Sequence, residues 1–380
     1  MDSSSLDVVA AGHICVDITP DIDSVSAGEI GEILRPGKLL EVGSPTISSG
    51  GPVSNTGLTL RRLGLDVALM GKCGVDPFGD MLMEVISAEA PGAEQGMSVT
   101  PEAETSYSVV LAIPGFDRIF LHCAGCNHTF GPEDINGEVV SQARLFHFGY
   151  PPLMRRMYES NGEELEMILC DAADAGPATS LDMALPDPEG PAADADWREI
   201  LSRVLPHTDI FLPSLEELMF MLRRKRFEEL TSRPGGVVDN FSARDIRSLA
   251  TECLEMGCQV MVIKCGHLGA YLKTEARPEG LGQCLERPGV WGELEIFDPT
   301  YRVQTIESTT GSGDSSISGF LAAMLRGRDP EICMACLNAV GAQNLSRRDA
   351  VSGVRSWSET IEWVRERPDK NPVPPRLGDL

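Results

Sequence analysis

Strand-like and helix-like patterns alternate along this chain. Apolar, β-branched runs between polar residues predict buried strands, and apolar side chains spaced three and four apart predict helices. Strands are expected at residues 6–18, 66–74, 143–150, 179–185 and from 209, with two more around a glycine turn in 258–272. Helices are expected in 50–64, 77–90, 161–176 and up to 222. Because parallel strands need such crossovers, the pattern predicts one doubly wound α/β domain over 1–380, its mostly parallel sheet flanked by helices.

One pair of strand-like runs interrupts this alternation. Residues 106–114 and 118–125 are joined by Gly115-Phe116-Asp117 and predict a β-hairpin. A hairpin does not fit the crossover pattern, so we expect it in a separate small sheet. Three stretches resemble insertions or linkers, at 186–196, 223–240 and 274–293, and the proline-rich tail 367–380 is expected to be poorly ordered.

The charge balance narrows the range of partners. With 57 acidic and 32 basic residues the formal net charge is −25, which argues against nucleic-acid binding through neutralised phosphates. No apolar run approaches the roughly 20 residues that span a bilayer. The start of the chain lacks the basic and apolar regions of a signal peptide. Eleven scattered cysteines fit a reducing compartment, so we expect a cytoplasmic protein with no membrane partner.

A glycine-rich run precedes one predicted helix. Gly311-Ser312-Gly313-Asp314 is followed by apolar residues on one helical face. They are Ile317, Phe320, Leu321, Met324 and Leu325, and they predict a helix that begins near 313–315. The first N–H groups of a helix lack partners and carry partial positive charge, and glycine lets a phosphate approach them closely. This run therefore predicts an anion hole.

Asp314 is unexpected at an anion hole, because its carboxylate repels a phosphate. It has a use there if it accepts the proton of a hydroxyl that attacks the phosphoryl group. The alternative is a helix N-cap, a position that Asp favours.

The run resembles the C-terminal signature of the ribokinase-like, or PfkB, carbohydrate kinases. The match covers Ser308 to Asp314 and continues through Ser318-Gly319-Phe320-Leu321. Their N-terminal signature is matched more loosely by Gly50, Gly51, Asn55, Gly64 and Gly74. Further similar stretches are 71–82, 125–135, 260–272 and 337–350, so the resemblance spans nearly the whole chain. It implies ATP-dependent phosphorylation of a hydroxymethyl group on a small neutral sugar.

The resemblance also implies roles for individual residues. Asp314 is the expected catalytic base, and the backbone of Gly311, Ser312 and Gly313 is the expected anion hole. Residues expected to bind the sugar are Asp17, at the end of the first strand, and Gly50, Gly51 and Asn55, in the loop that closes over it. Residues expected to bind ATP are Lys264, Gly266, Gly269, Thr310 and Asn338.

Two positions depart from the family pattern. Where the family has Asn-x-x-Glu to organise Mg²⁺ and its waters, this chain has Ser214 and retains Glu217. A serine hydroxyl still hydrogen-bonds a metal-bound water, so magnesium dependence is expected, with Glu217 at the metal site. Ser308 stands where potassium-activated members often have Asp, which argues against activation by K⁺.

The hairpin, together with strands from 18–49, resembles the family's β lid over the sugar, so the lid is expected at about 18–49 and 105–127. Small exposed sheets have unpaired edges, which favours a homodimer formed through the lid. Two alternatives remain. A nucleoside kinase would use lid aromatics such as Tyr107, Phe116 and Phe120 to stack on a base, and a non-catalytic sugar-binding protein would keep the fold alone.

Overall fold

The structure is a computed structural model of the 380-residue chain. It describes residues 6–22, 35–113, 118–278, 281, 284–285, 288–347, 349–366 and 368–380. The predicted hairpin turn, part of the predicted lid and part of the 274–293 insertion lie outside these ranges.

An eight-stranded sheet forms the centre of the molecule, in the order β14-β13-β12-β11-β10-β9-β1-β4. The strands are β1 (Leu6–Gly12), β4 (Val67–Met70), β9 (Ala143–Gly149), β10 (Ala178–Asp182), β11 (Ile210–Phe211), β12 (Val260–Lys264), β13 (Ala270–Thr274) and β14 (Glu295–Asp298). From β12 to β4 all neighbours are parallel, and β13 alone runs in the opposite direction, antiparallel to both β12 and β14. The predicted mostly parallel α/β sheet is confirmed.

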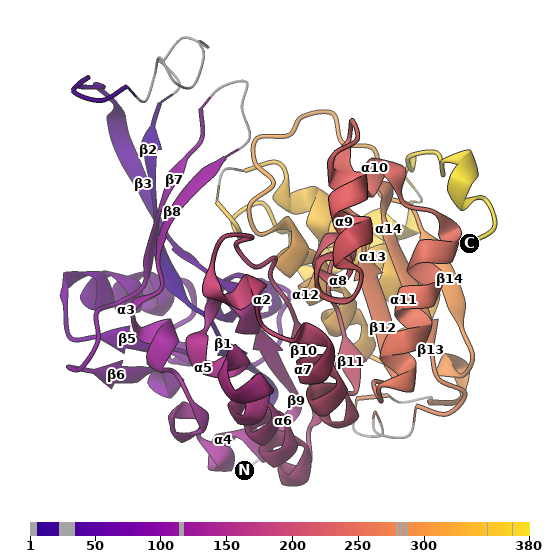
Figure 1. Cartoon of the computed structure of the whole chain (residues 1–380). Helices are drawn as coiled ribbons and strands as arrows, with labels where there is room; N and C mark the ends of the chain where they lie inside the picture. Colours follow the sequence, from indigo (N-terminus) through magenta and orange to yellow (C-terminus); the bar gives the residue numbers. More distant parts are fainter. Residues whose placement is uncertain are drawn as a thin grey trace.

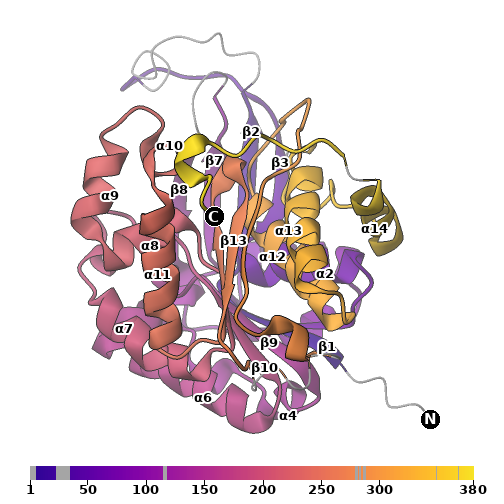
Figure 2. The same cartoon turned by 90° about the vertical axis from the view of Figure 1, so that its right-hand side faces the viewer.

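Helices cover both faces of this sheet (Figure 2). One face carries α2 (Pro52–Arg62), α12 (Ser312–Leu325), α13 (Pro330–Asn344) and α14 (Trp357–Arg365). The other carries α6 (Glu163–Ala175), α7 (Trp197–Val204), α8 (Leu215–Leu222) and α11 (Ala243–Glu255). The other helices are α3 (Pro77–Glu89), α4 (Gly137–Val140), α5 (Arg155–Tyr158), α9 (Arg224–Thr231) and α10 (Gly236–Asn240). No helix in the described ranges is long and apolar enough to cross a membrane.

The central strands supply a core on each face. Side chains alternate along a strand, so Val8 and Ala10 pack with α2, α12 and α13, whereas Val9 packs with α6, α7 and α8. Strands covered on both sides are mostly apolar on both faces, and for that reason the sequence shows them as nearly continuous runs rather than alternating ones.

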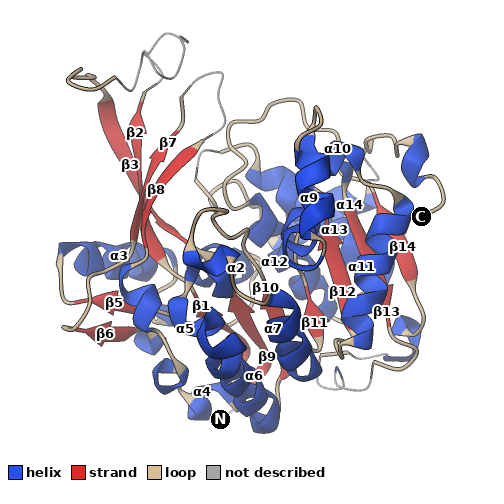
Figure 3. Ribbon diagram, viewed as in Figure 1, coloured by secondary structure: helices blue, strands red, loops and turns tan. Residues whose placement is uncertain are grey.

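A second sheet projects from this body (Figures 1 and 3). Its order is β3-β2-β7-β8, with β2 (Cys15–Asp21), β3 (Gly43–Gly50), β7 (Tyr107–Leu111) and β8 (Ile119–Cys123). The predicted hairpin is present as the antiparallel pair β7–β8. We refer to this four-stranded sheet as the lid sheet.

Two strands predicted as single elements are in fact divided. The run 6–18 breaks after Gly12, whose φ of +118° turns the chain beside Gly149. Its first half joins the central sheet and its second half the lid sheet, so Asp17 lies within β2 and not at the end of the first strand. The run 66–74 breaks at Gly71, and β5 (Lys72–Gly74) pairs with β6 (Ser98–Thr100) in a separate ladder. The predictions of single strands here were wrong.

The remaining segments follow the surface of the body. The 223–240 stretch forms α9 and α10. Residues 368–380 cross the end of the sheet between α14 and α10 (Figure 2), and Leu377 is fully buried there.

Candidate active site

Four polar side chains lie where parallel strands of the central sheet end. His13 follows β1, Tyr150 follows β9, and Asp182 and Lys264 are the last residues of β10 and β12. Because these strands are parallel, their carboxyl ends meet at one edge, the usual ligand-binding edge of a doubly wound sheet. The sequence analysis named only Lys264 among them.

Helix α12 begins at this edge. Gly311 is its N-cap residue with a φ of +67°, and a Cβ there would lie 2.4 Å from the Cβ of Ala350. The helix begins at Ser312, close to the predicted start. Asp314 stands in the first turn and makes no capping hydrogen bond, so the helix-cap alternative was wrong.

The Asp314 carboxylate is buried, with 1% of the residue exposed. Its Oδ2 accepts a hydrogen bond from Asn55 Nδ2 at 2.8 Å, and its Oδ1 accepts one from the Tyr150 hydroxyl at 2.9 Å. Burial raises the pKa of Asp314 above its ordinary value, while Asn55, Lys264 and Tyr150 act in the opposite direction. These contacts fix the orientation of the carboxylate.

Tyr150 is held in an unusual backbone conformation. Its φ of +63° lies in the left-handed region, which a bulky residue rarely occupies. Strain of this kind is tolerated where surrounding structure and function favour it. The sequence analysis missed Tyr150, although its place directly after the strand-like "ARLFHFG" was an available signal.

Two consecutive glycines approach Asp17 and His13 closely. A Cβ on Gly50 would lie 2.3 Å from Asp17 Oδ2, and one on Gly51, whose φ is +85°, would lie 2.6 Å from His13 Nδ1. Both positions therefore require glycine. Burial raises the pKa of Asp17 to about 6, against the hydrogen bonds from Cys15 and Ser108. Three of the predicted sugar-binding residues thus share one small region, and Asn55 links it to Asp314.

Two histidines border the same region. His13 Nε2 lies 3.4 Å from His122 Nε2, and His122 Nδ1 lies 3.0 Å from Ser108 Oγ. Burial and then the neighbouring histidines lower the pKa of His13 well below its ordinary value, and burial also lowers the pKa of His122. Both rings are therefore neutral near pH 7. The sequence analysis missed this pair because β1 and β8 are distant in the chain.

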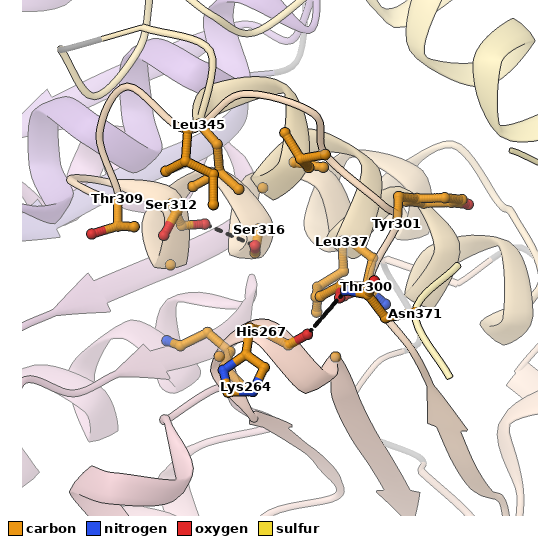
Figure 4. A pocket seen from close by; sticks show the side chains of 18 of the residues that line it. Lys264, His267, Thr300, Tyr301, Thr309, Ser312, Ser316, Leu337, Leu345 and Asn371 are labelled. Atoms are coloured by element: carbon orange, nitrogen blue, oxygen red, sulfur yellow. Dashed lines mark hydrogen bonds between the residues drawn. The ribbon is translucent and has the colours of Figure 1, made fainter. Parts of the chain in front are cut away.

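A cavity of about 550 Å³ opens on the other side of α12 (Figure 4). Predicted site residues that line it are Lys264, Gly266, Gly269, Ser312, Gly313 and Asn338. A Cβ on Gly313 would meet nothing nearer than Lys264 Cε at 3.8 Å, so its backbone is open to the cavity. Thr310 and Gly311 do not line it, and the Thr310 carbonyl instead accepts a hydrogen bond from Asn344 Nδ2 at 2.7 Å.

Lys264 brings a positive charge to the cavity. Its Nζ lies 2.5 Å from Asp182 Oδ1 and donates to the Leu212 carbonyl at 2.6 Å. Burial lowers the pKa of Lys264, but the carboxylates of Asp182 and Glu217 outweigh it and raise the pKa overall. The ammonium group is therefore charged at neutral pH and is fixed in place by Asp182.

Glu217 lies in a smaller adjoining cavity of about 180 Å³, which Asp182, Glu216, Lys264 and Gly313 also line. Its carboxylate accepts from the Ser214 N–H at 2.6 Å, while Ser214 Oγ accepts from the Glu217 N–H at 3.2 Å. Within the described ranges no three His, Cys, Asp or Glu residues form a metal cluster of their own. Carboxylates beside such a cavity nonetheless suit Mg²⁺, which takes one or two of them and completes its shell with other oxygen ligands such as water.

The lid contacts the loop before α12. Arg118, just before β8, donates from Nη1 to Ser308 Oγ at 3.3 Å and from Nη2 to Thr309 Oγ1. Its charge also lowers the pKa of Asp17, against the effect of burial. A guanidinium group therefore lies between the Asp17 region and the 550 Å³ cavity.

Comparison with known proteins identifies the family. The model of the pfkB family of carbohydrate kinases matches residues 6–357. The chain belongs to the pfkB family of carbohydrate kinases. The predicted enzyme class, an ATP-dependent sugar kinase, is confirmed by this membership.

Its relatives are similar only at a distance. A sugar kinase of Archaeoglobus fulgidus is 23% identical over 295 residues, 78% of this chain and 97% of the relative. A probable fructokinase-4 of Arabidopsis thaliana is 25% identical over 361 residues, 93% of this chain and 94% of the relative. These identities leave the substrate of this pfkB-family kinase open.

Solved structures share the fold. A fructokinase of Xylella fastidiosa with bound ATP superposes with a TM-score of 0.70 at 19% identity, covering 95% of this chain and 98% of that one. An Arabidopsis thaliana ribokinase with ribose and ATP gives 0.69 at 17% identity, covering 95% and 99%. The ribokinase-like fold of this pfkB-family member is therefore confirmed.

Proposed function

We propose that this kinase transfers the γ-phosphoryl group of ATP to a hydroxymethyl group of a small neutral sugar. The observation that carries this proposal is the position of Asp314. Its carboxylate is joined through Asn55 to the region of Asp17, Gly50 and Gly51, while Ser312 and Gly313 on the same helix turn line the 550 Å³ cavity. One carboxylate thus lies between a group of polar side chains that suits the hydroxyls of a polyol and a cavity that suits a nucleotide.

The residues around Asp314 suit phosphoryl transfer. The acceptor oxygen forms a bond to the γ-phosphorus as the bond to the β–γ bridging oxygen breaks, and the hydroxyl proton passes to Asp314. The Gly313 backbone, which is open to the cavity, is the part of the predicted anion hole that suits the negative charge on the phosphoryl oxygens, since Gly311 does not line the cavity and the Ser312 N–H donates to the Thr309 carbonyl at 3.2 Å. Lys264 adds a fixed positive charge. Mg²⁺ bound with ATP would neutralise further phosphate charge, with Glu217 and Asp182 as the side chains to hold it.

The charges near Asp17 favour a neutral acceptor. Asp17 and Asp314 place two carboxyl groups there, and burial keeps His13 and His122 uncharged. The two carboxyl groups repel a sugar acid or sugar phosphate, whereas sugar hydroxyls hydrogen-bond to all four groups. The positive charge of Arg118 also reaches Asp17, but its guanidinium group donates to Ser308 and Thr309. Since several relatives carry the name fructokinase, fructose is the first acceptor to test.

Of the lid aromatics that the structure describes, neither Tyr107 nor Phe120 favours a nucleoside acceptor. The Tyr107 ring packs against Phe78, with 5.1 Å between centroids, and Phe120 is half exposed beside Arg118. Phe116 lies outside the described residues. A non-catalytic sugar-binding protein would not need a buried carboxylate at Asp314 or a charged Lys264–Asp182 pair, so these groups favour catalysis.

The test is acceptor-dependent formation of ADP from ATP and Mg²⁺ over a panel of neutral sugars, sugar acids and nucleosides. Replacing Asp314 with Asn keeps the shape but removes the base, so kcat should fall by about 10²–10⁴ while the KM for the sugar changes little. Asp174→Asn, at an exposed position of α6, is the matched control. Undiminished turnover in Asp314→Asn would show that another group is the base.

We further propose a homodimer formed through the lid sheet. Its outer strands β3 and β8 each have one neighbour, and Ile47, Phe120 and Leu121 are exposed there. Sedimentation of the wild type and of Leu121→Lys measures this, and a monomeric wild type contradicts it.

All eleven cysteines are free thiols, which supports a cytoplasmic location, testable by cell fractionation.

A further inference from the structure

Residues 368–377, the C-terminal strap, lie along the wall of the 550 Å³ cavity. The Asn371 N–H donates to the Thr300 carbonyl at 2.8 Å, Lys370 forms a β-bridge with Tyr301, and the Arg302 N–H donates to the Asp369 carbonyl at 2.9 Å. The match to the family model ends at residue 357, so the strap is a feature of this chain that the model does not cover.

Side chains anchor the strap at both ends. Lys370 forms an ion pair with Asp298, and its ammonium group lies 4.7 Å from the centre of the Tyr301 ring. Asp298 Oδ2 also accepts a hydrogen bond from Asn338 Nδ2 at 2.8 Å, which connects the strap to another cavity residue. At the far end Leu377 is fully buried, and Arg376 Nε donates to the Phe241 carbonyl at 3.1 Å. The strap is therefore docked on the body.

Asn371 is the strap residue that lines the cavity. Its Nδ2 donates to Thr300 Oγ1 at 2.9 Å, and no residue in the described ranges donates to its Oδ1. Asn371 and Tyr301 lie at the end of the cavity opposite Lys264 and Ser312 (Figure 4). Since the phosphates belong beside Lys264 and the amides of α12, this far end is where the base of a nucleotide would lie.

The far end also has the chemistry of a base site. Leu337, on the side of the cavity toward Thr300, offers apolar surface for a flat ring (Figure 4), and Ala342 and Leu345 add apolar lining to the cavity. The Oδ1 of Asn371 is a hydrogen-bond acceptor held in a fixed direction, because its Nδ2 is already engaged. Adenine presents an amino group at its 6-position, whereas guanine presents a carbonyl oxygen there.

We propose that the C-terminal strap is part of the nucleotide site and that Asn371 Oδ1 accepts a hydrogen bond from the 6-amino group of adenine. The proposal rests on the proposed function in one respect, that ATP occupies this cavity. The strap then contributes both affinity for the nucleotide and preference for adenine over guanine, which an apolar slot by itself does not supply.

Calorimetric titration of the full-length protein with ADP and with GDP tests this without any acceptor. Asn371→Ala should raise the Kd for ADP about threefold to tenfold, the value of one hydrogen bond, and reduce the preference for ADP over GDP. Lys370→Met should weaken ADP binding as well, because it releases the strap from Asp298. Val373→Ala is the matched control, since Val373 lies on the strap, is 40% exposed and does not line the cavity.

The outcomes separate the two proposals. If Asn371→Ala and Lys370→Met both bind ADP as tightly as Val373→Ala, with unchanged melting temperatures, the strap proposal is wrong even if the enzyme phosphorylates sugars. If the wild type binds ADP with the expected dependence on Asn371 but phosphorylates no alcohol, the strap proposal stands and the proposed function fails. A wild type that binds no ADP overturns both.

Discussion

The stability of Asp17 variants measures how much the buried carboxylate of the candidate sugar site lowers the unfolding free energy. In Asp17→Asn the buried carboxyl becomes an amide of the same shape, which retains an oxygen to accept from Cys15 Sγ but has no charge. Burial raises the pKa of Asp17 from 3.8 to about 6 in the folded protein. A raised pKa means that the fold disfavours the ionised form. The contribution of the protonated Asp17 carboxyl to the unfolding free energy is therefore fully present below pH 3.8, and it is lost as the pH rises through about 6.

The size of the effect follows from that shift. A difference of about two pKa units between the folded and unfolded states corresponds to about 3 kcal/mol of unfolding free energy at high pH. Roughly half of it is expressed between pH 5 and pH 8, because the unfolded carboxyl is already mostly ionised at pH 5. Asp17→Asn should therefore gain stability over the wild type as the pH rises across this interval, while losing affinity for the sugar.

Urea unfolding of wild type and Asp17→Asn at pH 5, 6, 7 and 8 measures the difference. The quantity of interest is how the gap in unfolding free energy changes with pH, since contributions that do not titrate cancel. Asp174→Asn, at an exposed aspartate, should show no such trend. A gap that stays constant from pH 5 to pH 8, or that favours the wild type increasingly, would refute the reasoning about burial.

Two further variants probe the neighbouring groups. Tyr150→Phe removes a donor from the buried Asp314, so the acid limb of the kcat profile should move to higher pH, and an unmoved limb contradicts a positioning role for Tyr150. Lys264→Met leaves Asp182 buried without its partner and should lower the unfolding free energy by about 3–5 kcal/mol in urea denaturation. Adding Asp182→Asn should restore much of that loss, and no recovery would show that the pair is not the cause.

Local sequence patterns predicted the helices and strands of the central sheet region, because each of these elements is determined by residues close together in the chain. The helix at 312–325 follows from the spacing of its own apolar side chains, and α6 ends at Gly176 as the sequence suggests. The strand boundaries could not be predicted from local sequence in the same way. In the runs 6–18 and 66–74 both halves are apolar, so nothing local reveals that Gly12 and Gly71 send them to different sheets.

Because of these errors in the strand boundaries, some residues of the candidate site were not identified from the sequence. The predicted strands 6–18 and 179–185 place His13 and Asp182 in their interiors, whereas β1 ends at Gly12 and β10 at Asp182, so both side chains lie at carboxyl ends of strands. The glycine-rich run before α12 was different, because the chemistry of Gly311 to Asp314 is contained in consecutive residues.

The sequence by itself determined the class of fold, the family and the placement of a carboxylate in the first turn of a glycine-led helix, since periodicity and a short motif depend only on neighbours in the chain. Only the tertiary structure decided what surrounds that carboxylate. Asn55, Tyr150 and Asp314 are separated by many residues, and the Lys264–Asp182 pair and the strap at Asn371 likewise join distant segments. Such contacts depend on how strand ends and loops converge at one edge of the sheet, which no local pattern encodes.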